Sequence, residues 1–163
     1  MHTIDAQNLT NESLVKEVDA KLRSIGHAFE ELTGSPNKTP SMILNLRSGM
    51  IENGIFRQHM EWLNNYVNPK ASILFAKERQ GKNFTPVTEI KCVTNEDQYS
   101  LKEGDVVLFC DEIGIIHYID GECIEYTILG EPVGKYSLYF ADEEHPIFIL
   151  GKVDTSNEDW ILN

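Results

Sequence analysis

The apolar pattern of this chain changes period once, and that change limits the folds open to it. From Leu14 to Leu32 the apolar residues recur in steps of three and four, which places them on one face of an α-helix. From residue 72 onward, short runs rich in Ile, Val, Phe, Tyr and Thr alternate with Gly, Asp, Asn and Pro, as strands joined by turns do. Helices followed by strands, without βαβ alternation, predict an α+β fold.

Three helices are expected before the strands begin. The first is capped at Thr10 or Asn11 and ends at Gly34. The second opens at Thr39-Pro40, with proline at the first helical position, and the third ends before Asn68-Pro69. With 163 residues, 41% of them hydrophobic, the chain is long enough to bury a core. A single domain is expected, with a helical part at 1–68 and a β part at 72–163.

The β part is predicted to form an antiparallel sheet or small barrel of six or seven strands. The predicted strands are SILFAKE, FTPVTEIKCV, DVVLFCD, GIIHYID, ECIEYTIL, KYSLYFAD and PIFILGKV. Asp120-Gly121 is a preferred pair for a two-residue hairpin turn, which would place His117 opposite Ile124 and Tyr118 opposite Cys123. In that register His117 and Cys123 lie on opposite faces of the sheet, so a metal site shared by them is not expected.

The formal net charge of −12 is concentrated toward the end of the chain. Residues 1–91 contain 11 Lys+Arg and 10 Asp+Glu, whereas residues 92–163 contain 3 Lys+Arg and 16 Asp+Glu, a balance of −13. Such an anionic field repels nucleic-acid phosphates and anionic lipid surfaces, and it speeds the encounter with a basic partner. Direct binding to nucleic acid or to a membrane is therefore not expected. Solubility alone is the alternative explanation of this charge.

The sequence also indicates the compartment in which the chain works. No apolar run approaches the twenty residues that a membrane span needs, and the first thirty residues lack the basic-then-apolar order of a secretory signal. The three cysteines, Cys92, Cys110 and Cys123, are irregularly spaced, which fits reduced thiols better than a disulfide framework. We therefore expect a cytoplasmic protein.

The segment FCDEIGIIHYIDGECIEY, residues 109–126, contains the side chains best suited to catalysis. Cys110 and His117 share a face of the sheet for some lengths of the turn after Cys110 and not for others. If they meet, the histidine could take the thiol proton and the thiolate could attack a carbonyl. The sequence has no zinc-ligand spacing, phosphate loop or hydrolase elbow, so no metal or cofactor is expected.

Residues 101–126, LKEGDVVLFCDEIGIIHYIDGECIEY, resemble the barrel of the NlpC/P60 and CHAP-type papain-like peptidoglycan amidases. In both, a Gly-Asp turn launches a strand and a second strand follows, and helices precede the barrel. The family's nucleophile is a cysteine at the start of a preceding helix, where this chain has Ser41 after Thr39-Pro40. The family's histidine corresponds to Glu112 or Ile113. The resemblance therefore implies a degenerate relative without the nucleophile.

Three functional hypotheses follow from these features. The first is a non-enzymatic binding protein that covers a basic surface of a partner protein, as an immunity protein does on a nuclease toxin or a phage inhibitor does on a nucleic-acid-handling enzyme. The second is a thiol-dependent hydrolase that uses Cys110 and His117, and the third is a structural or assembly subunit. For the first, carboxylates at or beside predicted turns would gather along one rim of the sheet: Asp111, Glu112, Asp120, Glu122, Glu125, Asp142, Glu143 and Glu144.

Overall fold

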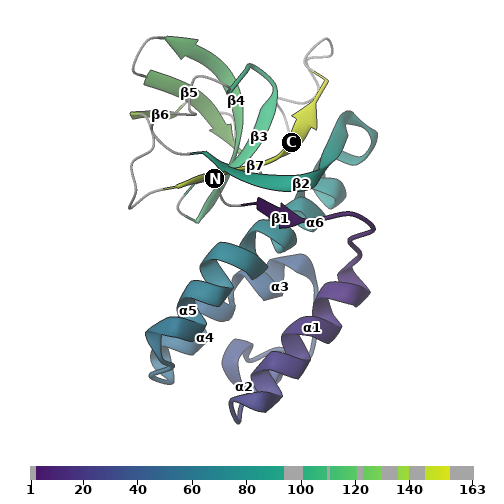
Figure 1. Ribbon diagram of the computed structural model, residues 1–163, viewed down its shortest axis with the longest axis vertical. Helices are drawn as coiled ribbons and strands as arrows, with labels where there is room; N and C mark the ends of the chain where they lie inside the picture. The colour runs from purple at the N-terminus through teal and green to yellow at the C-terminus, as the bar shows by residue number, and fades with distance from the viewer. Residues whose placement is uncertain are drawn as a thin grey trace. The chain divides into compact units, whose positions relative to one another are not determined.

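The computed structural model describes residues 3–93, 101–109, 111–120, 123–129, 136–139 and 146–154 (Figure 1). The chain divides into two compact units. One, the helical unit, is Asn8–Phe75; the other, the β unit, consists of Met1–Gln7 and Ala76–Asn163. The α+β fold predicted from the change of period is confirmed. The expected single domain stays a prediction.

The helical unit contains α1 (Asn11–Ser24), α2 (Phe29–Thr33), α3 (Pro40–Leu44), α4 (Leu46–Glu52) and α5 (Arg57–Trp62). Thr10 caps α1 as predicted. Its hydroxyl accepts a hydrogen bond from the Ser13 N–H at 3.1 Å, and the Ser13 hydroxyl accepts one from the Thr10 N–H, also at 3.1 Å. This reciprocal capping satisfies two backbone donors that the first turn of a helix leaves free.

The first predicted helix is not continuous, because it breaks after Ser24. Gly26 adopts a left-handed conformation, with φ at 86°, and the chain turns before α2 begins at Phe29. The apolar face predicted for this stretch is nevertheless buried, in one core that α1 to α4 and the following helix share. That core contains Leu14, Val18, Leu22, Phe29, Leu32, Ile43, Leu46, Met50, Leu63, Val67, Ala71 and Leu74.

The expected helix end at Asn68-Pro69 is wrong. After α5 the helix passes through a π-helical turn at Leu63–Val67, labelled η1, and continues as α6, Asn68–Gln80. Proline lacks an N–H, and its ring crowds the carbonyl four residues earlier, so an ordinary α-helical turn is strained there. The π turn, whose hydrogen bonds reach five residues back, comes directly before this proline and accommodates it.

The predicted strand SILFAKE is also wrong, since residues 72–78 lie within α6. Residues 67–74 and 76 are all buried, so the apolar run is explained by a helix that packs on every side. A short apolar run of this kind cannot be assigned to helix or strand by its period alone. The boundary between the two units falls inside α6, between Phe75 and Ala76.

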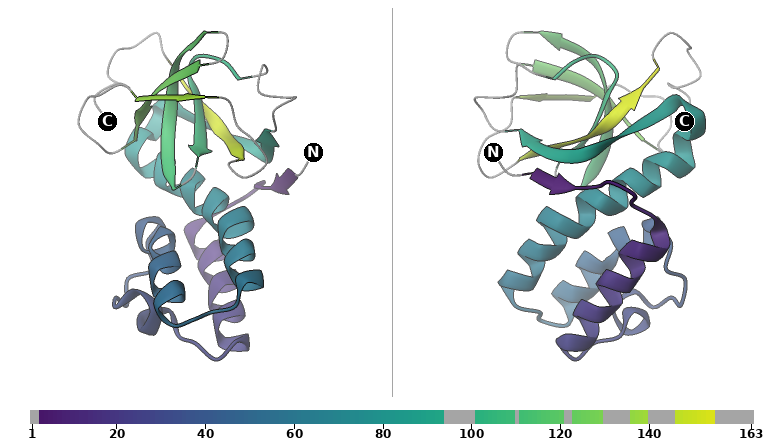
Figure 2. Two further views of the ribbon diagram at one scale, coloured as in Figure 1. Left: turned by 90° about the vertical axis from the view of Figure 1, so that its left-hand side faces the viewer. Right: turned by 45° about the vertical axis from the view of Figure 1, so that its right-hand side comes forward.

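The β unit contains one antiparallel sheet with the strand order β1-β2-β7-β3-β4-β5-β6. Its strands are β1 (Thr3–Asp5), β2 (Phe84–Val93), β3 (Asp105–Phe109), β4 (Glu112–Asp120), β5 (Cys123–Ile128), β6 (Tyr136–Tyr139) and β7 (Ile147–Val153). A short 3-10 turn, η2 (Gly81–Asn83), leads from α6 into β2. The sheet is strongly twisted and curved, as Figure 2 shows.

The seventh strand of this sheet comes from an unexpected part of the chain. β1, at the N-terminal end, pairs with the Glu89–Lys91 part of β2, and its three residues are too short to show a strand period. Within the described residues the sheet is open, with β1 at one edge and β6 at the other. The open-sheet alternative therefore holds, and the closed barrel does not. Val93, Leu101, Val107, Ile116 and Ile147 form a buried cluster of the β unit.

Gly49 provides a test of the packing in the helical unit. A Cβ atom at this position would lie 1.7 Å from the backbone oxygen of Leu32, so α4 approaches α2 too closely for any side chain. Because a backbone oxygen cannot rotate aside, we expect Gly49→Ala to lower the free energy of unfolding by about 3 kcal/mol. Urea unfolding followed by far-UV circular dichroism measures the change. Ser48→Ala introduces alanine at the exposed neighbouring position and should change the free energy of unfolding by less than about 0.5 kcal/mol. Equal losses in both variants would contradict the close helix contact.

Candidate functional site

The β3–β4 hairpin places two of the predicted partner-binding carboxylates at one end of the sheet. Phe109 pairs with Glu112, so the connection consists of residues 110–111 and not of the predicted DEIG turn. Both Asp111 and Glu112 are exposed. Glu112 also has a structural contact, because its Oε2 accepts a hydrogen bond from the Tyr126 hydroxyl at 3.0 Å.

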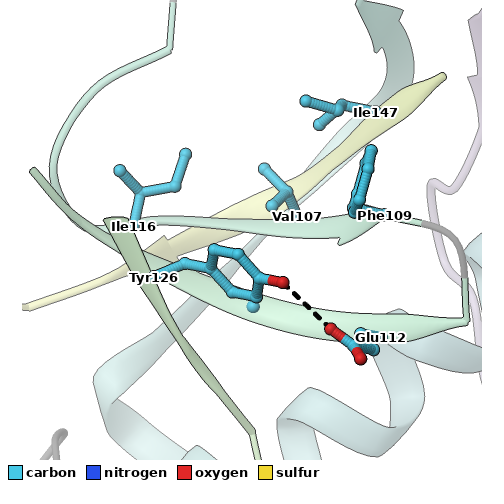
Figure 3. A pocket seen from close by; sticks show the side chains of 7 residues that line it. Val107, Phe109, Glu112, Ile116, Tyr126 and Ile147 are labelled. Carbon is cyan, nitrogen blue, oxygen red and sulfur yellow. Dashed lines mark hydrogen bonds between the residues drawn. The ribbon is translucent and has the colours of Figure 1, made fainter. Parts of the chain in front are cut away.

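A small cavity lies beneath this hydrogen bond, between the Tyr126 ring and apolar side chains of β3, β4 and β7 (Figure 3). The ring lies against Gly114, where a Cβ atom would be 2.8 Å from the ring carbon Cδ2. The cavity volume is about 10 Å³, which is room for one water molecule at most. The cavity is therefore a packing feature of the core and not a ligand site.

The β4–β5 hairpin differs from the predicted register by a β-bulge. Asp120 pairs with Cys123, Tyr118 with Glu125, and Ile116 with Tyr126, so the ladder shifts at His117. The His117 ring nitrogen Nε2 is hydrogen-bonded to the hydroxyl of the buried Thr127. The predicted turn at Asp120-Gly121 is wrong by one residue, and the inference that His117 and Cys123 lie on opposite faces loses its basis. The side chain of Cys123 lies outside the described residues.

An exposed aromatic residue lies beside a carboxylate near the end of β4. Tyr118 is 55% exposed and stands directly opposite Glu125, which is half-buried on β5. Directly paired residues of an antiparallel sheet project from the same face with their Cβ atoms about 5 Å apart. Tyr118 and Glu125 therefore form a small mixed surface, which we call the Tyr118 patch.

The predicted single acidic rim is not what the described residues form. Glu112 and Asp120 are the first and last residues of β4, about 26 Å apart along the strand at 3.3 Å per residue. Asp111 and Glu112 therefore lie at one end of this strand, and the Tyr118 patch lies toward the other. The remaining predicted carboxylates, Glu122, Asp142, Glu143 and Glu144, and the side chain of Asp120 lie outside the described residues.

The charge separation, by contrast, follows the two units closely. The helical unit contains 7 Lys+Arg and 7 Asp+Glu, a balance of 0. The β unit contains 7 Lys+Arg and 19 Asp+Glu, a balance of −12. The whole formal net charge of the chain thus belongs to the β unit.

The predicted pair of Cys110 and His117 stays a prediction, because Cys110 lies outside the described residues. Its neighbours Phe109 and Asp111 are at the β3–β4 turn. His117 is five residues along β4 from Glu112, about 16 Å from that turn, and is bonded to Thr127. Cys92 is the described thiol; burial raises its pKa, whereas a nucleophilic cysteine needs a lowered one.

A buried carboxyl stands at the start of β3. Asp105 is 4% exposed, and its Oδ2 accepts a hydrogen bond from the backbone N–H of Lys102 at 2.8 Å, which closes the turn before the strand. Burial raises the pKa of this carboxyl, and it outweighs the lowering effects of the Lys102 hydrogen bond and of the nearby Lys152 and Lys102 charges. Asp105 thus positions backbone and is not available to a partner.

A hollow in the helical unit was not predicted. It has a volume of about 450 Å³ and lies between two loops, the one that follows α1 and the one that joins α4 to α5. It is lined by His27 from the first loop, by Asn53 at the end of α4, and by Gln58 and His59 from the first turn of α5. The sequence did contain a signal for the two loops, because a glycine, Gly26 or Gly54, stands at the end of the helix before each of them. What the sequence could not show is that the two glycine turns meet.

Both loops are built in the same way. After α1 the N–H of His27 donates to Leu22 O and that of Gly26 to Arg23 O; after α4 the N–H of Ile55 donates to Met50 O and that of Gly54 to Ile51 O. This pair of bonds, with a left-handed glycine, is the Schellman helix end. Gly26 and Gly54 supply the left-handed residue, with φ at 86° and 65°. The backbone of the hollow is therefore hydrogen-bonded and ordered.

Comparisons with known proteins identify no relative: no family model, curated protein or solved structure matches this chain. The resemblance of residues 101–126 to NlpC/P60 and CHAP-type amidases stays a prediction. Among the described residues, no three His, Cys, Asp or Glu side chains lie close enough to hold a metal ion together. None of the described helices combines the length and the apolar character needed to cross a membrane.

The buried Asp105 carboxyl makes the stability of the protein depend on pH in a testable way. Its raised pKa means that the native state binds a proton more tightly than the unfolded state, so its contribution to stability is present in acid and is lost as the pH rises through the native pKa. We expect Asp105→Asn, which keeps an acceptor for Lys102, to raise the melting temperature relative to the parent at pH 7. This gain should shrink toward zero below the ordinary aspartate pKa of 3.8. Thermal unfolding from pH 3 to 7 measures it. Glu103→Gln, with the same charge change at an exposed neighbour, is the control, and a gain of equal size there would show that net charge alone is responsible.

Proposed function

We propose that this protein is a non-enzymatic binding protein whose acidic β unit covers a basic surface of a partner protein. The observation that carries the proposal is the charge division: a balance of −12 in the β unit and 0 in the helical unit. If acidity served solubility alone, it would have no reason to be confined to one structural unit. A partner that handles nucleic acid, such as a nuclease toxin or a phage target enzyme, has a basic surface of the required kind.

The Tyr118 patch supports the proposal at the level of side chains. Tyrosine is enriched at the energetic centres of protein interfaces, because its ring buries a large area at low entropic cost while its hydroxyl still finds a polar partner. A tyrosine that is 55% exposed on a β-strand, beside a carboxylate, combines an apolar anchor with a charge. Asp111 and Glu112 add exposed carboxylates at the other end of β4.

The kinetics expected of such a surface follow from its charge. A field of this sign steers a basic partner into encounter, and it raises the association rate more than it slows dissociation. Salt screens charges beyond about 8 Å at physiological ionic strength, so the rate advantage falls as salt is added. A cytoplasmic location is part of the same proposal, because nucleic-acid-handling enzymes and their inhibitors meet there.

The test begins with the full-length tagged protein bound to a column at low ionic strength. Lysate of the source cells is passed over it, bound proteins are eluted with a salt gradient, and mass spectrometry identifies them. We expect one stoichiometric basic protein that elutes at moderate salt. Glu125→Lys should then lower the association rate with that purified protein about tenfold, and Tyr118→Ala should mainly speed dissociation.

A charge reversal in the neutral unit serves as the matched control. Glu52→Lys changes the charge by the same amount at an exposed position of α4 and should leave the association rate within about twofold. The proposal fails if no basic protein is captured. It also fails if Glu125→Lys and Glu52→Lys have equal effects, since the rate would then depend on net charge and not on the Tyr118 patch.

A further inference from the structure

The hollow of the helical unit has the size and construction of a small-molecule site. Its volume of about 450 Å³ lies within the usual range for ligand pockets. It is formed by two hydrogen-bonded helix ends, so its backbone needs little ordering when a ligand enters. The acidic surface of the β unit plays no part in it, and the inference that follows is independent of the proposed partner.

The polar side chains that line the hollow are imidazoles and amides, which form hydrogen bonds. They are two imidazoles, His27 and His59, and two amides, Asn53 and Gln58, and the described lining includes no Lys, Arg, Asp or Glu. Each of these four side chains offers both a donor and an acceptor. A phosphate or a carboxylate would find no Lys or Arg among these lining residues. The lining therefore favours a neutral ligand whose edges alternate donors and acceptors.

Two of these side chains are already oriented by neighbours. The Asn53 amide Nδ2 donates to the Gly49 carbonyl oxygen at 2.8 Å, which leaves its Oδ1 as an acceptor. The His27 ring nitrogen Nδ1 is buried 3.5 Å from the Glu31 carboxylate oxygen Oε1, which orients the ring. The imidazole can offer a ligand its other nitrogen, Nε2, as a donor or an acceptor.

The apolar part of the lining points to a flat ring. Phe56 is 74% exposed, an unusual state for a phenylalanine, and it lines the hollow together with Ile25 and Ile55. An aromatic face at the mouth of a pocket can stack on a planar ligand, and base-on-aromatic stacking contributes binding energy for every nucleobase. Asparagine and glutamine amides match the paired donor and acceptor of a base edge.

We propose that this hollow binds a free nucleobase or nucleoside, with the base stacked on Phe56 and its edge hydrogen-bonded by Asn53, Gln58 and the two imidazoles. The ligand is the uncharged compound and not its phosphate, because the lining has no cation to hold a phosphate. The site is in the unit whose own net charge is zero.

The test is an NMR titration of the isotope-labelled full-length protein with adenosine, guanosine, cytidine and uridine, each to about 5 mM. The imidazole signals of His27 and His59 are assigned with His27→Gln and His59→Gln. We expect at least one nucleoside to shift both signals along a saturable curve while the signal of His117 in the β unit stays fixed. Phe56→Ala should weaken binding about tenfold or more. Because Phe56 is exposed, this change should not unfold the protein.

The control is Ile51→Ala, which removes a 58% exposed apolar side chain of the helical unit that does not line the hollow and should leave the dissociation constant unchanged. The corresponding 5′-monophosphates should bind no more tightly than the nucleosides. The proposal is overturned if no nucleoside shifts His27 and His59 by about 5 mM, if Phe56→Ala binds as the parent does, or if the monophosphate binds more tightly.

Discussion

The continuation of a helix across Pro69 is the constraint on which the rest of the structure depends. Proline would end an α-helix at Asn68, and the π turn η1 at Leu63–Val67 provides the geometry in which the helix passes it instead. As a result η1 supplies Leu63 and Val67 to the helical core, and α6 supplies Ala71 and Leu74 to the same core. The same helix contains one of the two boundaries between the units, the one between Phe75 and Ala76.

The two units have different physical characters. The helical unit is electrically balanced and contains a hollow lined by neutral hydrogen-bonding groups. The β unit has the whole net charge of −12, an exposed tyrosine beside a carboxylate, and a core in which the one small cavity of Figure 3 holds no more than a water molecule. On the proposals made above, the chain would recognise charge with one unit and a small neutral molecule with the other.

Two of the predicted site residues have structural contacts that a sequence does not show. Glu112 accepts a hydrogen bond from the Tyr126 hydroxyl, and His117 is hydrogen-bonded to Thr127 at a β-bulge. A residue with such a contact has less freedom to serve a partner or a reaction, because moving it leaves a polar group unpaired. Tyr118 and Glu125, by contrast, are brought together by the strand register alone, as directly paired residues of β4 and β5. Glu125 was a predicted partner-binding residue and Tyr118 was not, and only the strand pairing shows them as one surface.

The sequence by itself determined what depends on neighbours within one turn or one strand. The cap at Thr10, the apolar face from Leu14 to Leu32, the six strands from Phe84 onward and the excess of carboxylates after residue 91 follow from local chemistry. Only the tertiary structure decided what depends on contacts between distant residues: the helix through Pro69, the pairing of Thr3–Asp5 with β2, the bulge at His117 and the meeting of two glycine turns around His27 and His59. The physical reason is a difference in energy. A local propensity contributes about 0.5 kcal/mol per residue, and the burial and strand pairing of distant segments contribute more than that in total.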